Sequence, residues 1–567
     1  MNRTPVISIS LVVAAIAISA ISWQRMQPEA PEGFNLAAFE RLPVQQGGRI
    51  KPMGSFAETV MLAISDKRTW KDAEGVRRPA SQWLLDAMTM LPDRPGAAVS
   101  HSNPASLRAQ VFRIEHDGVL DTLGLEPRDG FRYAAMEFAD ALPATEGQFA
   151  AAQAAEPARR TLHQEKLVEL REQWATFKAL VERRTPGLIP PPDGEQWPAL
   201  IAFMQPDTGQ VVGALPGQFA QMLQAWRAGD ADAFNRHLAD YQQAIEAAAP
   251  GAVRDAGVEY YFTQARPMLH PTLMYLIALL VVCIGWLGGW RSLITAAVWL
   301  AIVAFVIHTA ALGMRMYIQG RPPVTNLYSS AVFAGWVAVA LALVMEWIFR
   351  NGLNAAIGSV VGFATLIIAI NLELARDGQT MGTMQAVLDT NFWLATHVTT
   401  ITMGYGGTFL AGALGIFYIL AGLFTRQLDP AADRSLARMI YGVICFALLF
   451  SFVGTVLGGI WADQSWGRFW GWDPKENGAL IIVLWNALIL HARFGGMIRN
   501  RGLAVCAVFG NVVTAWSWFG VNMLGVGLHA YATASGAVTL GLFVISQLFI
   551  MALGLLPDRL WRSRAPA

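Results

Sequence analysis

The chain has 567 residues, of which 54% are hydrophobic and only 15% are charged. This charged fraction lies well below the quarter that is usual for soluble domains, which excludes a single soluble globular domain. The 42 Lys and Arg residues nearly balance the 41 Asp and Glu residues, so no basic field exists that would attract nucleic acid. The three cysteines lie in apolar runs without C-x-x-C spacing, which argues against disulfide scaffolding, zinc binding and dithiol chemistry.

The chain begins with an apolar segment that runs from Val6 to about Trp23. Its length favours a retained membrane anchor over residues 1–25, and a cleaved signal peptide is the alternative. Either interpretation sends the segment that follows across the membrane.

Residues 26–266 have the composition of a soluble protein and form the second predicted region. Apolar residues at helical spacing in 164–184 and 217–249 predict a mostly helical domain, interrupted by a proline-rich linker around 186–192. Its histidines are scattered through the sequence and indicate no catalytic constellation: His101, His116, His163 and His237. The role of this domain is not indicated by its residues.

Residues 267–567 contain apolar stretches long enough to cross a hydrocarbon core of roughly 30 Å, for which about twenty residues suffice. The predicted fold class is therefore mainly α, a polytopic membrane helix bundle with an N-terminal anchor and a mostly helical extracytoplasmic domain. Lys and Arg gather in alternate loops, which predicts a cytoplasmic C-terminus in the cytoplasmic (inner) membrane. Nine spans are expected near 269–288, 293–313, 327–349, 353–372, 393–424, 438–460, 477–495, 502–520 and 535–556.

The stretch 461–476 is predicted to be an extracytoplasmic loop between the sixth and seventh of these spans. It holds four tryptophans within twelve residues: Trp461, Trp466, Trp470 and Trp472. Tryptophan is common at membrane interfaces, which gives one explanation. The density favours a second one, a flat aromatic platform for a large planar ligand.

The same stretch ends in Asp473-Pro-Lys-Glu476, which has the pattern of a helix start. Asp at the N-cap, Pro at the first helical position and Glu at the third predict a capping box for the next span. A rigid helix start is compatible with function because it would hold the tryptophans in place.

The pattern Trp466-Gly-x-x-Trp-x-Trp-Asp-Pro-Lys-Glu476, preceded by Gly458-Gly-x-Trp461, resembles the tryptophan-rich WWD motif of haem-handling proteins in cytochrome c maturation. The layout over about 269–556 resembles the CcsA/ResC subunit of the system II haem lyase. The segments 320–328 and 527–531 resemble further outer segments of that family. The resemblance implies haem binding, with haem b as substrate and transiently bound ligand.

Two histidines are expected at the level of the Trp stretch. His397 lies about four residues into its span, and His529 lies in the loop before the last span. Two neutral imidazoles at one level can supply both axial ligands of a haem iron. We expect His397, His529, the four tryptophans and Asp473 to form the outer haem site.

His491 lies about fourteen residues into its span, or roughly 21 Å below the outer surface, and is expected not to reach the outer pair. Its position matches the intramembrane haem-ligand histidine of the family. The second intramembrane histidine of the family comes from a CcsB/ResB component, so the resemblance implies a separate CcsB/ResB-like membrane subunit. His308 and His270 are expected to be packing or interfacial residues.

The expected activity is that of a haem lyase subunit, a holocytochrome c synthase, that uses no nucleophile of its own. Haem would move from His491 to the outer site, where the thiols of a C-x-x-C-H segment in apocytochrome c would add to its vinyl groups. Arg468 and Lys475 either pair with the haem propionates as exposed cations or face solvent. Because no cysteine lies outside the spans, a thioredoxin-like protein would keep the substrate thiols reduced.

Two other functions remain open from the sequence. A haem exporter or a haem-containing electron-transfer subunit would bind haem without attaching it. Permanent haem sites usually place histidine pairs at similar depth on facing spans. The different depths of His397 and His491 disfavour this function. A solute transporter is expected to show repeated or broken spans and would leave the Trp stretch unexplained.

Overall fold

The computed structural model describes residues 30–90, 108–155, 160–191, 196–205, 210–374, 380–382, 384, 388–529 and 536–564, with a few positions before residue 30. The predicted anchor at 1–25, His101 and Tyr531 lie outside the described residues, apart from isolated positions of the anchor. The chain divides into two compact units. The transmembrane unit comprises 1–23, 267–371 and 384–567, and the soluble unit comprises 24–266 and 372–383.

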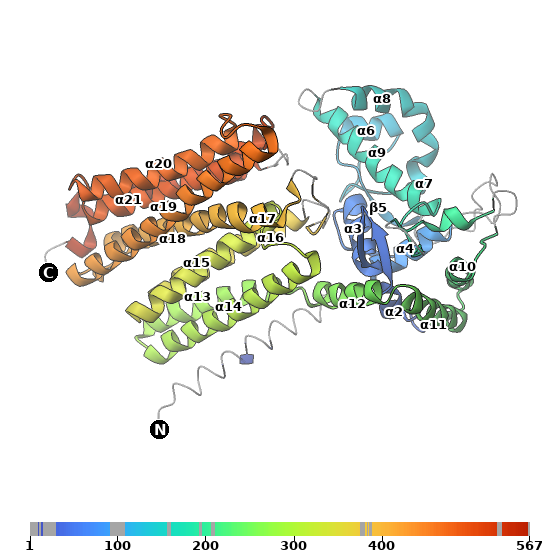
Figure 1. Cartoon of the computed structure of the whole chain (residues 1–567), viewed down its shortest axis with the longest axis horizontal. Coiled ribbons are helices and arrows are strands. Elements are labelled where there is room, and N and C mark those ends of the chain that lie inside the picture. Colours follow the sequence, from blue (N-terminus) through green and yellow to red (C-terminus); the bar gives the residue numbers. More distant parts are fainter. Residues whose placement is uncertain are drawn as a thin grey trace. The chain divides into compact units, whose positions relative to one another are not determined.

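The soluble unit is mostly helical (Figure 1), and its described residues also include three small antiparallel sheets of two strands each. Its helices α9, α10 and α11 carry apolar residues at helical spacing and bury that face in one hydrophobic core. Its helices are α2 (Leu36–Glu40), α3 (Met53–Ser65), α4 (Ala80–Met88), α6 (Asp117–Leu123), α7 (Ala135–Phe138), α8 (Glu146–Ala154), α9 (Leu162–Val181), α10 (Ala214–Ala228), α11 (Ala231–Ala248) and α12 (Pro250–Ala265). The paired strands are β1 (Pro43–Gln46) with β2 (Arg49–Pro52), β3 (Thr69–Lys71) with β4 (Arg77–Pro79), and β5 (Gln110–Arg113) with β6 (Arg132–Ala134).

The prediction of a proline-rich linker around 186–192 is wrong, because the described residues of this segment pack into the core of the soluble unit. Leu188 and Ile189 are buried, and Gly187 forms backbone bridges with Gln45 and Ala199. The hydroxyl of Tyr241 donates to the carbonyl of Leu188. Prolines interrupt the helices here without separating two domains.

The histidines of this unit are also less scattered than the sequence indicates. The rings of His116 and His163 lie 5.4 Å apart between centroids. His116 is the N-cap of α6, where its Nδ1 accepts from the backbone N–H of Gly118. This gives His116 a local structural role.

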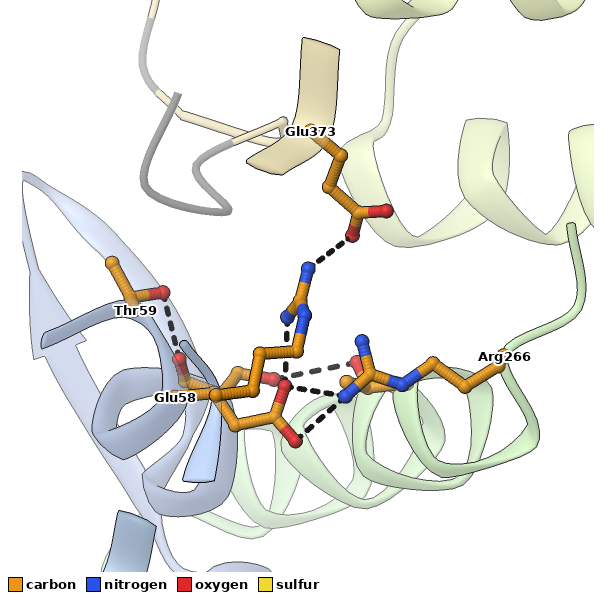
Figure 2. A network of polar contacts seen from close by, with 7 residues as sticks. Glu58, Thr59, Arg266 and Glu373 are labelled. Atoms are coloured by element: carbon orange, nitrogen blue, oxygen red, sulfur yellow. Dashed lines mark hydrogen bonds and ion pairs between the residues drawn. The ribbon is translucent and has the colours of Figure 1, made fainter. Parts of the chain in front are cut away.

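A four-residue charge network lies inside the soluble unit (Figure 2). Glu58 on α3 accepts from Arg68 at 2.7 Å and from Arg266 at 2.8 Å, and Arg68 also donates to Glu373 at 2.7 Å. Burial opposes ionisation of Glu58, but the two guanidinium groups outweigh it and lower the pKa of this carboxyl. The network joins α3 to the end of α12 and to the segment that starts at residue 372.

The transmembrane unit is a bundle of long apolar helices, and its polytopic, mainly α class is confirmed. Among the described residues, nine helices are long and apolar enough to cross a membrane, as the sequence predicts. Helices α18, α19, α20 and α21 run beside one another (Figure 1). The elements are α13 (Leu269–Gly288), α14 (Arg291–Gln319), α15 (Leu327–Phe349), α16 (Leu353–Leu374), α17 (Asn391–Trp393), α18 (Thr399–Phe424), α19 (Pro430–Trp466), α20 (Pro474–Phe494), α21 (Asn500–Ala515), α22 (Val521–Met523) and α23 (Ala537–Gly554).

Among the described residues of this bundle, two turns are π-helical. The turn η5 (Leu394–Val398) joins α17 to α18 and contains His397, and η6 (Trp516–Gly520) joins α21 to α22. Single π-turns inside α-helices are rare in proteins overall, and those that occur are often found at functional sites.

Candidate functional site

The stretch 461–476 is a loop only over 467–473 and is helical at both ends, so the prediction of one continuous loop is wrong for 461–466 and 474–476. Helix α19 continues through Trp466 and ends at Gly467, whose φ of +70° suits a helix C-cap. Only 467–473 separate α19 from α20. A helix of 37 residues is about 55 Å long, well beyond the hydrocarbon core, so Trp461 and Trp466 stand on a rigid extension.

The four tryptophans do not form one flat platform, which corrects the second prediction for this stretch. Trp470 and Trp472 are nearly perpendicular, with 86° between their ring planes. Trp461 lies 5.8 Å from His397 between ring centroids, and Trp466 lies 4.9 Å from His529. Each histidine thus has one tryptophan against its ring.

Trp472 has an unusual backbone conformation. Its φ is +57°, a region that bulky residues seldom adopt, and 70% of the residue is exposed. The amide of Asn477 donates to its carbonyl at 3.0 Å and supports this conformation. Backbone strain of this kind costs about 1 to 3 kcal/mol and is concentrated at functional sites.

His397 is held against the backbone of α19. Its Nδ1 lies 2.8 Å from the carbonyl oxygen of Gly454, so Nδ1 carries the proton and Nε2 carries the lone pair. A Cβ at Gly458 would lie 2.5 Å from Cε1 of the same ring. Gly454, Gly458 and Trp461 follow one another at helical spacing, so one face of α19 forms the cradle of His397.

His529 is held by the capping residue of α20. The carboxylate of Asp473 lies 3.3 Å from His529 Nδ1 through Oδ1, and its Oδ2 accepts the backbone N–H of His529 at 3.3 Å. Burial lowers the pKa of His529, although the carboxylates of Asp473 and Glu476 oppose this effect. The imidazole is therefore neutral at pH 7, and the Asp473 contact favours the proton on Nδ1 and the lone pair on Nε2.

The predicted capping box is confirmed. Asp473 is the N-cap of α20, Pro474 occupies the first turn, and Asp473 Oδ1 accepts the N–H of Lys475 at 2.9 Å. Glu476 Oε2 accepts the N–H groups of Gly471 at 2.7 Å and Asp473 at 3.1 Å. Asp473 therefore caps the helix and orients His529 at the same time.

The two cations predicted to be exposed are turned inward. Lys475 is half-buried and donates from Nζ to the carbonyl oxygens of Ser517 and Trp518. Arg468 lies with Nη1 3.7 Å from Glu476 Oε1, over Gly471, where a Cβ would overlap the guanidinium. Neither side chain is the solvent-exposed cation that the sequence predicts.

His491 lies at the opposite end of α20, eighteen residues after Asp473 and thus about 27 Å away along the helix axis. It is exposed and its Nδ1 lies 2.8 Å from the carbonyl of Ala487. His308 is fully buried beside Tyr275 and His270 is half-buried, which agrees with packing roles. The structure thus brings His397 and His529 to the end of the bundle that carries Trp461, Trp466, Trp470 and Trp472, which we call the Trp-rich end. It keeps His491 apart from them.

One supporting residue was not identified from the sequence. Trp393 stacks parallel to Trp461 at 6.3 Å between centroids, and its Nε1 donates to Gln464. It precedes His397 by four residues, and this one-turn spacing is the signal that would have indicated it.

Comparison with known proteins matches the part of the chain that holds this site. A family model described as "Cytochrome C assembly protein" matches residues 324–529, which include all three histidines. The "Cytochrome c biogenesis protein CcsA" of a Synechococcus strain is 30% identical over 260 residues, covering 41% of this chain and 85% of that protein. Its counterpart in Trieres chinensis is 30% identical over 270 residues, covering 41% and 86%.

"Protein NrfI" of Wolinella succinogenes is 33% identical over 239 residues, which is 41% of this chain but only 25% of that longer protein. The matched CcsA proteins, in contrast, are covered over most of their length. The chain therefore belongs to the CcsA family of cytochrome c biogenesis proteins and is a multi-pass membrane protein of cytochrome c maturation.

Proposed function

We propose that this chain holds haem b at its Trp-rich end, with His397 and His529 as axial ligands, for covalent attachment to apocytochrome c. The observation that carries the proposal is the matched state of the two imidazoles. In each, Nδ1 faces a fixed oxygen, of Gly454 or of Asp473, which leaves the lone pair on Nε2 for iron. Trp461 and Trp466 beside these rings supply apolar surface for the porphyrin.

The attachment step needs no nucleophile from this chain. A thiol of the C-x-x-C-H segment adds across a haem vinyl group: the sulfur–carbon bond forms, and the thiol proton ends on the other vinyl carbon. The chain positions the haem for the thiols and supplies ligands to its iron, and in this way it acts as a haem lyase. The histidine of the substrate then replaces one protein ligand. A thioredoxin-like partner keeps the two thiols reduced.

His491 is proposed as an earlier haem ligand on the path from the cytoplasm. Its side chain continues the exposed stripe of Ile481, Leu484 and Leu488 on α20, so it faces away from its own bundle. This position suits a second ligand from a CcsB/ResB-like subunit. The Trp-rich end and the soluble unit are assigned to the extracytoplasmic side of the inner membrane by the distribution of Lys and Arg.

The alternative is a haem exporter or an electron-transfer subunit that binds haem without attaching it. It shares the ligands with the lyase but predicts no thioether product. The experiment that separates these functions is co-expression of the chain with a CcsB/ResB-like subunit and an apocytochrome c.

The first measurement is the reduced absorption spectrum of the detergent-purified protein, for wild type, His397→Gly and His529→Gly. We expect a low-spin haem spectrum in wild type, its loss in each variant, and its return when free imidazole fills the vacated position. His237→Gly on α11 is the matched control and should keep the wild-type spectrum. Haem that survives both substitutions unchanged contradicts the ligand assignment. Haem binding without covalent cytochrome c supports the exporter.

A further inference from the structure

Asp473 and Lys475, on either side of Pro474, contact the two ends of one segment. We call this segment, Ser517–His529, the His529 arm. At its start, Lys475 Nζ donates to the carbonyl oxygens of Ser517 at 3.0 Å and Trp518 at 3.2 Å. At its end, Asp473 contacts the backbone and the ring of His529. Two opposite charges on the first turn of α20 thus hold both ends of the arm.

The start of the arm lies in a π-turn, and Lys475 supplies a cationic donor to its carbonyl groups. In η6 the helix is widened by one residue, so the regular ladder of backbone hydrogen bonds is interrupted. Trp518 O accepts from the amide of Asn522 as well as from Lys475. An ammonium group has three donors and can serve two carbonyls at once.

Helix α20 packs closely against η6 at Gly478. A Cβ at Gly478 would lie 2.7 Å from the hydroxyl oxygen of Ser517 and 3.0 Å from its Cα. The Trp518 indole in turn donates to Ser330 on α15 at 2.9 Å. Lys475 therefore reaches the arm inside a closely packed contact.

The end of the arm approaches Asp473 through a glycine. Gly527 has a φ of +91°, and a Cβ there would lie 2.0 Å from Asp473 Oδ2 and 3.1 Å from Pro474 Cδ. Only glycine adopts this conformation without strain and also leaves space for the carboxylate. The arm is thus shaped to fit the Asp473 side chain.

We propose that Lys475 is a positioning residue for His529 and is not a partner of the haem propionates. Its role for haem rests on the proposed function, but the contact with the arm does not. Loss of the ammonium leaves the start of the arm without its donor, and His529 then occupies its ligand position for less of the time. The expected haem phenotype of a Lys475 variant therefore resembles that of His529→Gly.

The test compares Lys475→Met with Lys475→Arg in the full-length protein. In the haem-free protein, amide hydrogen exchange within 517–529 should rise at least tenfold in Lys475→Met and return toward wild type in Lys475→Arg. In the haem-loaded protein, Lys475→Met should lose the low-spin spectrum and regain it with imidazole. Arg438→Met is the control, since Arg438 is an exposed cation near the start of α19, at the other end of that helix from Trp466.

Two results would overturn the proposal. One is unchanged exchange in the arm of Lys475→Met. The other is weaker haem binding with an unchanged spectrum and no imidazole response, which is the pattern of a lost propionate partner. If wild type binds no haem, the proposed function fails, and the exchange result alone decides whether Lys475 holds the arm.

Gly527→Ala is the second variant, because Lys475→Met can fail to fold. It perturbs the other end of the arm while keeping the ammonium in place. We expect the same imidazole-dependent recovery of the low-spin spectrum. A Gly527→Ala protein with a wild-type spectrum would show that the arm does not need this close fit.

Discussion

The Trp-rich end of the transmembrane unit and the charge network of the soluble unit satisfy their polar side chains in different ways. In the first, the partners are mostly backbone groups: Glu476 accepts from two backbone N–H groups, Lys475 donates to two carbonyls, and His397 faces a third. In the second, Glu58, Arg68, Arg266 and Glu373 pair with one another.

The difference has a physical cause. Backbone groups that a π-turn or a helix end releases, and that are buried from water, must be satisfied within the protein, so charged side chains are drawn to them. Where water reaches a polar group, it can solvate that group after its partner side chain is removed. A pair of charged side chains therefore contributes less to the free energy of unfolding there. We therefore expect large, salt-insensitive effects at the Trp-rich end and small, salt-sensitive ones in the network.

The largest effect is expected for Gly458→Val. The new side chain would occupy the place of the His397 ring, which lies 2.5 Å from the position of a Cβ. Overpacking of this kind should weaken haem binding by about 3 kcal/mol, which corresponds to a loss of low-spin haem on the order of 100-fold. The measurement is haem occupancy and spectrum of the purified protein.

Gly442→Val on the same helix is the matched control. A Cβ at Gly442 meets no atom within 4 Å, so this substitution adds the same side chain to α19 without touching the cradle. If Gly442→Val reduces haem as much as Gly458→Val, the loss comes from α19 itself and the cradle assignment is wrong.

The cradle also shows what the sequence could and could not predict. Apolar length predicts the nine spans, and Asp473-Pro-Lys-Glu476 predicts the start of α20, because both depend on local preferences. The depth of His491 follows from the rise of a helix. These features require no knowledge of which helices touch.

The rest depends on tertiary packing. The π-turn at His397 and the stacking of Trp393 on Trp461 arise where α18 meets α19, and hydropathy does not encode that register. The inward turn of Lys475 depends on carbonyls more than forty residues away. The continuation of α19 through Trp466 had a local signal, Gly467 at the position of a C-cap.

A smaller effect is expected for Glu346→Ala, elsewhere in the transmembrane unit. Glu346 is buried and accepts the N–H groups of Gly352 at 2.7 Å, Asn354 at 3.2 Å and Ala355 at 3.4 Å, so it caps the start of α16. Removing the carboxylate takes away the acceptor of these N–H groups and should lower the free energy of unfolding by about 2 kcal/mol. The measurement is the thermal unfolding midpoint in detergent.

The result should not depend on salt, because the partners are backbone groups. Equal midpoints for wild type and Glu346→Ala would show that water or lipid headgroups satisfy these N–H groups. The distinction between the two regions would then fail at this position.

The smallest effect is expected in the charge network, where two variants remove different parts of it. Arg68→Met removes the cation that Glu58 and Glu373 share, and Glu373→Gln removes only the outer carboxylate. Each should cost less than about 1 kcal/mol, since these side chains remain partly exposed, and added salt should reduce the cost further. The measurement is amide hydrogen exchange in α3 and at the end of α12, in the full-length protein.

A large cost that salt leaves unchanged would contradict this expectation. Loss of about 3 kcal/mol or more in Arg68→Met is the behaviour of a buried ion pair that has lost one partner. The network would then resemble the Trp-rich end, and the comparison between the two regions would fail.

Acid gives the same network a second test with a defined sign. Because Arg266 and Arg68 hold the pKa of Glu58 below its usual value of 4.5, the folded state binds fewer protons than the unfolded state near that pH. The contribution of Glu58 is thus fully present above about pH 4.5 and is lost as the pH falls through the folded pKa. Glu58→Gln should remove this part of the acid dependence of exchange in α3 and leave the pH response at the start of α16, which Glu346 caps, unchanged. If acid weakens the start of α16 as much as α3 in wild type, the two regions do not differ in the way their charges are satisfied.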